Sequence, residues 1–179
     1  KRYEISPVSW KQHQEDIVSG KRQFATGAFD TPERRKLMYV SKSYRDEENS
    51  YFLLKENERK NSYRNVDGFL KYIKENRKKI GVIDGYKFAD SKVNDYVNDP
   101  KNADLIVKSK TDLENMHLTL EGKIDGFLAD RVVGATILWQ NGYSKKVSEK
   151  YLGIKAPIHM LLSRSTVTAE EAMLVDKYI

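Results

Sequence analysis

One arginine of this chain has the type and position of a carboxylate-binding residue. Arg34 closes the run Thr31-Pro32-Glu33-Arg34, which follows a predicted strand by one short loop. A guanidinium presents a planar fork of donors that pairs bidentately with a carboxylate. The alternative interpretation is structural, because Arg34 stands next to Arg35 and Lys36 and such charge runs usually coat a solvated face.

One aspartate in the second half of the sequence has a comparable position. Asp130 comes directly after the apolar residues 124–129, which are predicted to be a strand. Ligands of open α/β sheets bind at such strand ends, where a carboxylate can accept hydrogen bonds from an ammonium group. The structural alternative is that Asp130 caps the N-terminus of a helix over residues 131–138.

Residue types needed for other chemistries are scarce. His13, His117 and His159 are too widely spaced for a short metal motif, and the chain contains no cysteine, so we expect no metal and no cofactor. The sequence has no phosphate-binding glycine motif and no nucleophile elbow, and we therefore assign no catalytic residue and do not expect an enzyme. Trp10 and Trp139 fall on predicted helix faces and are interpreted as packing residues.

The composition is that of a folded protein with a modest positive charge. The chain has 179 residues, 39% of them hydrophobic, and its net charge is +6 from 32 basic and 26 acidic residues. Basic and acidic residues alternate almost everywhere, so no long basic block favours a nucleic acid partner. No apolar run approaches the ~20 residues of a membrane span, and no signal sequence opens the chain, so any targeting segment is expected to have been removed.

The spacing of apolar residues predicts strands that alternate with helices. Helices are expected over residues 10–19, 66–77, 88–97 and 112–120, and a further helix should start at Thr31 and Pro32. Strands are expected over residues 3–8, 23–28, 37–40, 50–54, 80–83, 105–107 and 124–129. Helix-bearing connections of this length favour a parallel sheet with helices on its faces.

Two segments share the pattern of a helix, a Gly-Lys pair and a strand. The first has Gly20-Lys21 at the end of its helix, and the second has Gly122-Lys123. Glycine at a helix end adopts the left-handed conformation cheaply, and lysine there complements the negative end of the helix dipole. The pattern arises either by chance from a common cap or from two similarly built α/β lobes.

In order and spacing, these segments resemble the bacterial extracellular solute-binding proteins for polar amino acids. The first match runs from Ser19 through Thr31-Pro32-Glu33-Arg34 to Tyr44, and the second is the run Glu-Gly-Lys-Ile-Asp-Gly-Phe-Leu-Ala-Asp at residues 121–130. The segment Gly-Val-Ile-Asp-Gly at residues 81–85 lies between them, where the family opens its second lobe. The match covers residues 3–172.

The resemblance implies an α/β, two-lobed periplasmic-binding-protein-like fold of the Venus flytrap type, with parallel-rich sheets flanked by helices. Residues 1–55 and 157–179 would form lobe 1, and residues 56–156 would form lobe 2. Family members carry a strand and a helix before the first match and terminal helices after the last one. The chain is therefore expected to be truncated at both ends, with an incomplete first lobe.

The resemblance also implies a ligand site in the cleft between the lobes, where Arg34 binds the α-carboxylate of the ligand and Asp130 its α-amino group. Phe29 replaces a small or hydroxyl residue and would narrow the pocket. Tyr86 and Lys87 replace small hydroxyl residues and are either ligand contacts or exposed loop residues. The full expected set of ligand-binding residues is Arg34, Asp130, Phe29, Thr31, Tyr86 and Lys87. Gly85, followed by a helix start, is expected to offer backbone N–H groups to an anion.

The function implied by this resemblance is the binding of an amino acid or related solute for uptake by an ABC transporter. The partners would be the small ligand and the transporter's membrane permease, the location periplasmic or otherwise extracytoplasmic, and the protein a monomer without a nucleic acid partner. The alternative is a ligand-sensing domain of a membrane-bound signalling protein or cell-wall enzyme. Further alternatives are a dehydratase of this fold, a degenerate lobe pair with no small ligand, and a surface that binds anions or nucleic acid through its net charge.

Overall fold

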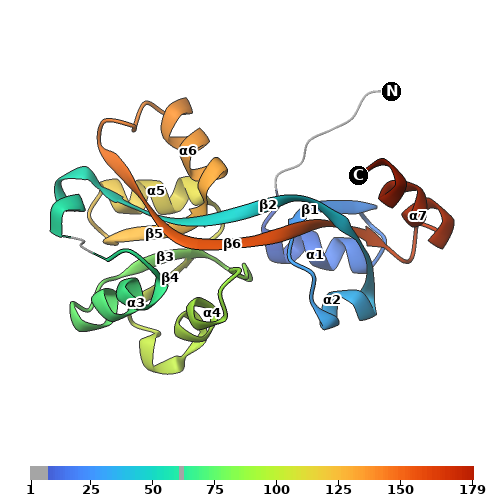
Figure 1. Ribbon diagram of the computed structural model, residues 1–179, viewed down its shortest axis with the longest axis horizontal. Coiled ribbons are helices and arrows are strands. Elements are labelled where there is room, and N and C mark those ends of the chain that lie inside the picture. Colours follow the sequence, from blue (N-terminus) through green and yellow to red (C-terminus); the bar gives the residue numbers. More distant parts are fainter. Residues whose placement is uncertain (1–7, 61–62) are drawn as a thin grey trace. The chain divides into compact units, whose positions relative to one another are not determined.

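The computed structural model describes residues 8–60 and 63–179 and divides into two compact units (Figure 1). Unit 1 consists of Lys1–Arg45 and Pro157–Ile179, and unit 2 of Asp46–Ala156. Residues 46–55, expected in the first lobe, are part of unit 2. The strand expected over residues 3–8 lies, except for its last residue, outside the described chain.

Unit 1 is a small α/β unit. Its elements are α1 (Trp10–Val18), β1 (Phe24–Ala28), α2 (Pro32–Leu37), the first part of β2 (Met38–Leu54), the last part of β6 (Val147–Ser163) and α7 (Ala169–Tyr178). β1 pairs antiparallel with β6, with Phe24 opposite Leu162. Its buried core lies between α1 and the sheet and is formed by Ile17, Ala25, Ala28, Met38 and Leu161.

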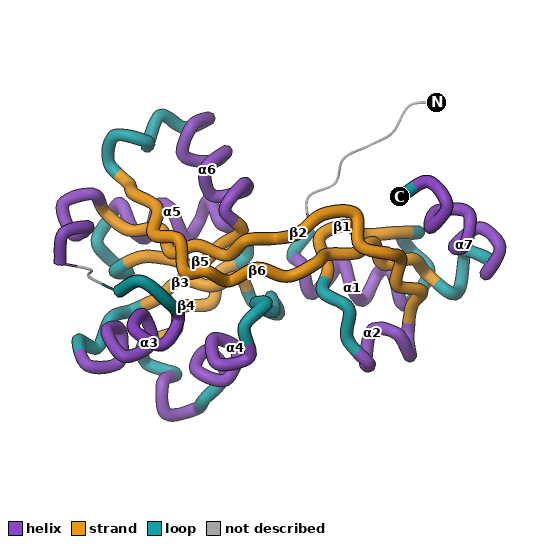
Figure 2. Tube along the Cα trace, in the orientation of Figure 1, coloured by secondary structure: helices purple, strands orange, loops and turns teal. Residues whose placement is uncertain are grey.

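Unit 2 contains the parallel part of the structure. β3 (Ile80–Ile83) lies between β4 (Ile106–Ser109) and β5 (Gly126–Asp130) and runs parallel to both, while β2 pairs antiparallel with β5. The strand order in this unit is β6, β2, β5, β3, β4, with β6 contributing its first part, so the sheet is mixed and not parallel throughout. The long strands β2 and β6 are neighbours, and each belongs partly to both units (Figure 2).

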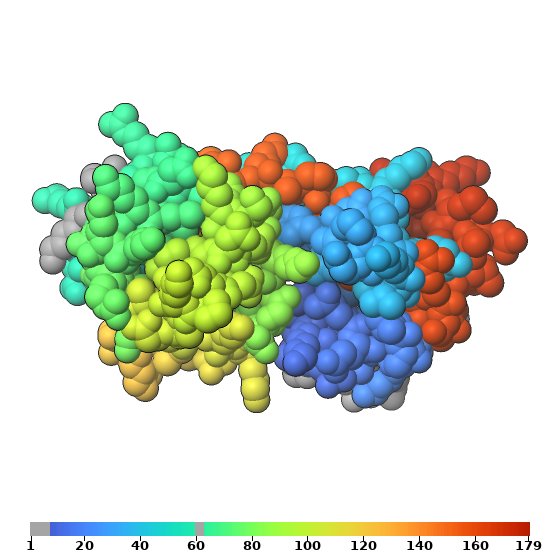
Figure 3. Space-filling model, turned by 90° about the horizontal axis from the view of Figure 1, so that it is seen from below, coloured from blue at the N-terminus to red at the C-terminus, as the bar shows by residue number. Residues whose placement is uncertain are grey.

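Helices cover both faces of the unit 2 sheet. α3 (Val66–Glu75) and α4 (Ser91–Asn98) lie on one face, and α5 (Asp112–Leu120) and α6 (Arg131–Gln140) on the other (Figure 1). Because side chains alternate along a strand, Tyr51 and Leu53 pack with α3 while Phe52 packs towards α5 and α6. The short 3-10 helices are Lys55–Lys60 and Pro100–Asn102. The green and yellow-green segments that carry α3, α4 and the second 3-10 helix form the face of this unit seen in Figure 3.

The predicted helix ends are largely confirmed, because they depend on local chemistry. Thr31 caps α2 by accepting from the Arg34 N–H at 3.2 Å, with Pro32 at the first helical position. Gly20 and Gly122 end α1 and α5 with φ of +80° and +68°. The strands expected over residues 37–40 and 50–54 are in fact one continuous strand, β2.

The interpretation of Trp139 as a packing residue is wrong, because 78% of its surface is exposed. Trp10 does pack against the core of unit 1. Within the described residues, no helix has both the length and the apolar character that a membrane span requires.

Candidate functional site

The guanidinium of Arg34 is buried in unit 1 and held in a fixed orientation. Only 7% of the residue is exposed. Nη1 donates to the Phe29 carbonyl oxygen at 2.6 Å, and Nε and Nη2 both donate to Oε1 of Gln14, at 3.3 and 3.1 Å. The guanidinium carbon lies 5.8 Å from the centre of the Trp10 ring, within cation–π range. Arg34 is therefore a preorganised cation and not a solvated surface charge.

Phe29 and Thr31 were expected to contact the ligand, and in the structure both contact Arg34. The backbone carbonyl of Phe29 orients Arg34, and the hydroxyl of Thr31 is occupied by the α2 cap. Neighbouring Arg35 is more exposed and forms an ion pair with Asp30 at 2.5 Å. The two adjacent arginines thus differ in their surroundings, because Arg34 is buried and Arg35 is exposed.

Asp130 lies at the end of β5 in unit 2 and caps α6. Its Oδ1 accepts from the Val133 N–H at 3.0 Å, which is the structural role expected as the alternative. The residue is 6% exposed, and its direct partner on the antiparallel strand β2 is Asn49. A capping carboxylate has a second oxygen, so this role is compatible with ligand binding.

A second carboxylate reaches this region from β2. Glu47 is buried, and its Oε1 accepts hydrogen bonds from the Tyr86 hydroxyl and, at 2.8 Å, from the Asn49 side-chain amide. The Asn49 Oδ1 in turn accepts from the Ala89 N–H at 3.3 Å. Burial, followed by the nearby Glu47 carboxylate, raises the pKa of Tyr86 well above its ordinary value. Tyr86 is therefore a neutral hydrogen-bond donor at any physiological pH.

Asp112, at the first turn of α5 directly after β4, supplies a third carboxylate. Burial, followed by the charges of Asp130 and Glu47, raises the pKa of Asp112 to about 7. Its buried Oδ1 has no hydrogen-bond partner among the described residues, which also give Asp112 no ion pair. Half of the Asp112 carboxyls are consequently protonated near neutral pH.

These residues form one group, which we call the acidic cluster: Glu47, Asn49, Tyr86, Asp112 and Asp130. The members after β3, β4 and β5 lie at the carboxyl ends of parallel strands, where open α/β sheets bind ligands. The charges of Asp130 and Glu47 add to burial in raising the pKa of Asp112, and a positive charge beside Asp112 would relieve that repulsion. The described residues hold no group of three or more His, Asp or Glu side chains placed to bind a metal ion.

Two expectations for this region are modified by the structure. Lys87 is exposed, whereas the adjacent Tyr86 is tied to Glu47. Gly85 has a φ of +75°, but α4 begins only at Ser91, and the Asp90 side chain accepts from the N–H groups of Lys92 and Val93. The expected anion site between Gly85 and a helix start is therefore wrong.

Glu47, Asn49 and Asp112 were missed by sequence reasoning. A partial signal existed, because Glu47 and Asn49 are two residues apart and share one face of a strand. Asp112 follows Thr111, which caps α5 with its hydroxyl, and so has the appearance of an ordinary acidic residue in the first turn of a helix. Only the pairing of β2 with β5 brings Asn49 opposite Asp130.

Comparison with solved structures gives close matches over nearly the whole chain. The arginine-, lysine-, histidine-binding protein ArtJ from Geobacillus stearothermophilus matches with a TM-score of 0.72 and 17% identity, over 98% of this chain and 71% of that one. The chain has the fold of amino-acid ABC transporter substrate-binding proteins. This confirms the predicted fold class, with the sheet more mixed than expected.

Further structures with the substrate-binding-protein fold are equally similar. The amino acid ABC transporter substrate-binding protein AbpA from Streptococcus pneumoniae, bound to L-arginine, matches with a TM-score of 0.72 and 18% identity over 97% of this chain and 68% of that one. A histidine kinase sensor domain with similarity to periplasmic binding proteins also matches, with a TM-score of 0.72 and 13% identity over 94% and 67%. No family model and no curated protein sequence matches the chain.

Proposed function

We propose that this protein binds a small cationic solute, with a cationic amino acid as the best candidate, for uptake by an ABC transporter. The acidic cluster of unit 2 is the observation that carries the proposal. An α-ammonium group compensates one carboxylate, and a ligand with a second cationic group compensates another. A cation beside Asp112 would offset the repulsion that the charges of Asp130 and Glu47 exert on its ionised carboxylate.

Within this proposal Asp130 accepts hydrogen bonds from the ammonium group of the ligand. Glu47 and Asp112 face the remaining positive charge, and the neutral Tyr86 hydroxyl fixes the Glu47 carboxylate. Charge-assisted hydrogen bonds of this kind are about twice as strong as neutral ones. The buried position of Asp130, at 6% exposure, strengthens its attraction for a cation further.

Arg34 is proposed as the contact for the ligand carboxylate. Its orientation is set by Phe29 and Gln14 before any ligand arrives, which reduces the entropy lost on binding. We propose three further neighbours of the ligand. These are Phe29 and Thr31, on either side of the loop before α2, and the exposed Lys87.

Proteins of the same fold support a cationic ligand. ArtJ is described as a binding protein for arginine, lysine and histidine, and AbpA was solved with L-arginine bound. An ancestral arginine-binding protein has been solved bound to arginine and bound to glutamine. These neighbours are binding proteins, and we propose a binding protein that acts outside the cytoplasm, works as a monomer, has no nucleic acid partner and is not an enzyme.

A sensing role is the second candidate. The histidine kinase sensor domain has the same fold, and it matches this chain with the same TM-score as ArtJ. In both roles the ligand chemistry is the same, and the two differ in the partner. Crosslinking of the ligand-bound protein to a permease favours uptake, whereas crosslinking to a kinase or cell-wall enzyme favours sensing.

A thermal-shift screen tests the proposed ligand class. L-Arginine, L-lysine and L-ornithine should raise the melting temperature at pH 8, because a ligand that binds only the folded state stabilises it by RT ln(1 + L/Kd), where L is the free ligand concentration. L-Glutamate and L-leucine are the matched controls with the same backbone and no side-chain cation. A protein stabilised by L-glutamate and not by L-arginine would contradict the assignment of the acidic cluster.

A further inference from the structure

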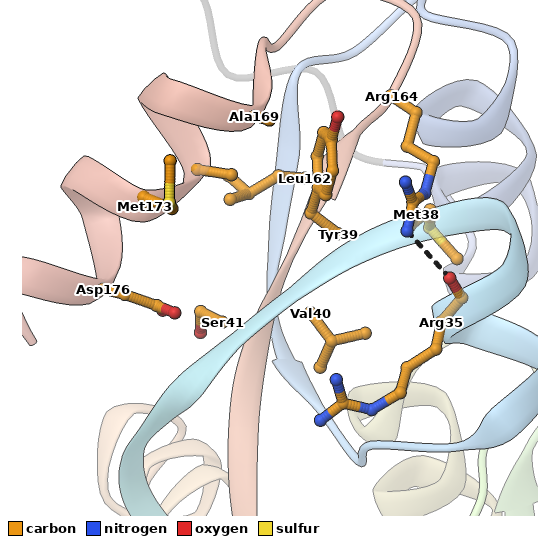
Figure 4. Close-up of a pocket in the computed structure, with 11 residues that line it drawn as sticks. Arg35, Met38, Tyr39, Val40, Ser41, Leu162, Arg164, Ala169, Met173 and Asp176 are labelled. Atoms are coloured by element: carbon orange, nitrogen blue, oxygen red, sulfur yellow. Dashed lines mark hydrogen bonds between the residues drawn. The ribbon is translucent and has the colours of Figure 1, made fainter.

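A pocket separate from the acidic cluster lies wholly within unit 1. It has a volume of about 230 Å³ and lies, open to solvent, between the strands β2 and β6 on one side and α7 on the other (Figure 4). Ligand pockets of proteins typically have volumes of ~300–1,000 Å³. This pocket therefore has room for a small organic molecule and not for a peptide or a nucleotide.

The wall of the pocket on the sheet side is apolar. Met38 and Leu162 are 2% and 4% exposed and line it from β2 and β6. Across from them, Ala169 and Met173 line it from α7 (Figure 4). Met173 faces the apolar residues of the two strands but is 64% exposed. The apolar side of α7 is therefore not packed tightly against the sheet.

α7 is capped at its own N-terminus and is hydrogen-bonded to β2 near its C-terminus. Its N-terminus has a capping box between Thr168 and Glu171, and near its C-terminus Asp176 accepts from the Lys42 N–H at 2.7 Å. None of the residues of α7 is buried. Most helices are stabilised by packing of an apolar face, which α7 lacks over the pocket. A ligand with an apolar body would supply that packing.

One arginine at the rim of the pocket has a fixed direction and no counter-charge in the described chain. The guanidinium of Arg164 lies 4.3 Å from the centre of the Tyr39 ring, and its Nη2 donates to the Arg35 carbonyl oxygen at 3.0 Å. Among the described residues this is its one hydrogen bond, and they form no ion pair with it. The neighbouring Arg35 guanidinium is already paired with Asp30. Arg164 thus keeps donors available for a carboxylate.

We propose that this pocket binds a small monocarboxylate with a compact apolar body, such as an arylalkanoate. Arg164 receives the carboxylate, and the body fills the space between Leu162 and Met173. Asp176 lines the opposite side of the pocket from Arg164 (Figure 4), and its charge disfavours a second carboxylate on the ligand. The site is independent of the acidic cluster and needs no cationic group on the ligand.

Methionine methyl NMR on the whole chain tests the proposal, with phenylacetate as the probe. The chain has four methionines, of which Met38 and Met173 line the pocket while Met116 and Met160 do not. Phenylacetate should shift the Met38 and Met173 signals with a dissociation constant of roughly 1 mM or lower. Acetate has the charge without the body, and benzyl alcohol has the body without the charge, so both should bind at least about tenfold more weakly.

Two variants and two controls locate the binding site. Arg164→Gln should weaken phenylacetate binding by about tenfold through loss of a charge-assisted pair, and Ala172→Phe should abolish it by filling the space. Lys177→Gln removes one charge from the same helix outside the pocket, and Asp130→Asn alters the acidic cluster. Both controls should leave binding unchanged. Equal shifts of all four methionines, no shifts at ~10 mM phenylacetate, or unchanged affinity in Arg164→Gln would overturn the proposal.

Discussion

The two units place opposite charges in opposite kinds of surroundings. In unit 1 the Arg34 guanidinium donates to the Phe29 carbonyl oxygen and the Gln14 amide oxygen and lies near the face of the Trp10 ring. In unit 2 the Asp130 carboxylate is joined by two further carboxylates, Glu47 and Asp112. The first arrangement stabilises its charge with dipoles, and the second concentrates like charges.

The contrast indicates how much each unit depends on a ligand. Hydrogen bonds to the Phe29 carbonyl and the Gln14 amide partly replace water around Arg34 and orient it without a ligand. Like charges around Asp112 oppose one another, and part of the charge is removed by protonation, since the pKa of Asp112 is about 7. Unit 2 therefore has more to gain from a positively charged ligand, and its residues should dominate the affinity.

The largest expected effect comes from Asp130→Asn. Asparagine is an equally good helix N-cap, so the α6 cap is kept and the free energy of unfolding should change by less than about 1 kcal/mol. The affinity for L-arginine should fall about 100-fold, because a buried charge pair is removed. Isothermal titration calorimetry measures the affinity, and thermal unfolding measures the stability. Unchanged affinity in the folded variant would remove Asp130 from the site.

The next effect concerns the pH dependence of stability. The pKa of Asp112 is about 7 in the folded state against 3.8 for the ordinary group. The folded protein keeps a proton that the unfolded chain has lost, so stability falls as pH rises from about 4 to about 7 and is then constant. A shift of this size corresponds to at most ~4 kcal/mol, and partial exposure lowers the expected change to about 2–3 kcal/mol.

Asp112→Asn isolates this contribution. The variant should lose the decrease of stability between pH 4 and 7, because the amide does not titrate. In the native chain the affinity for L-arginine is expected to increase by up to about tenfold for each unit that the pH rises towards 7, and the variant should lose this pH dependence. Urea unfolding at a series of pH values measures the first effect and calorimetry the second. Identical pH profiles for the native chain and the variant would show that Asp112 is not the titrating group.

Arg34→Gln is expected to have a smaller effect on binding than Asp130→Asn. Glutamine keeps part of the contact with Gln14 and Trp10 but loses the charge, and the affinity for L-arginine should fall by about tenfold. Lys36→Gln is the matched control, since it removes an exposed charge from the same helix α2 and should change the affinity less than twofold. A loss in Arg34→Gln that exceeds the loss in Asp130→Asn would reverse the proposed ranking of the two units.

The smallest expected effect is on the free energy of unfolding, and it compares the glycines of the two helix–Gly–Lys–strand segments. Gly122→Ala should cost about 1 kcal/mol, because an added Cβ meets nothing within 4 Å and only the left-handed backbone is penalised. Gly20→Ala should cost about 1 kcal/mol more, since its Cβ would lie 2.9 Å from that of Ser165. Denaturant unfolding of both variants gives the difference. Equal losses would mean that Gly20 is as open as Gly122.

The parts of the site that follow from local chemistry could be predicted from the sequence. The Thr31 cap places Arg34 at the start of α2, and Asp130 stands where an apolar strand ends and a helix begins. Glu47 and Asn49 could not be predicted in the same way, because their approach to Asp130 depends on the pairing of β2 with β5, more than seventy residues further along the chain.

The predicted fold class is confirmed, but some elements depended on tertiary structure. β2 and β6 are each 17 residues long, and the sequence of β2 contains a polar stretch that suggested two shorter strands. Residues 43–48 are nevertheless extended, because they continue a strand that is paired on both sides of this stretch. Trp139 lies on an apolar-looking helix face that the fold leaves exposed, which periodicity alone cannot distinguish from a buried face.

The central claim, that the acidic cluster receives a positively charged group, is tested most directly by a pair of ligands that differ in one charge. L-Arginine and L-citrulline have nearly the same shape, and only arginine carries a side-chain cation. Calorimetric titration of the native protein at pH 8 should give an affinity for L-arginine at least about tenfold higher than for L-citrulline. Equal affinities, or tighter binding of L-citrulline, would contradict the claim.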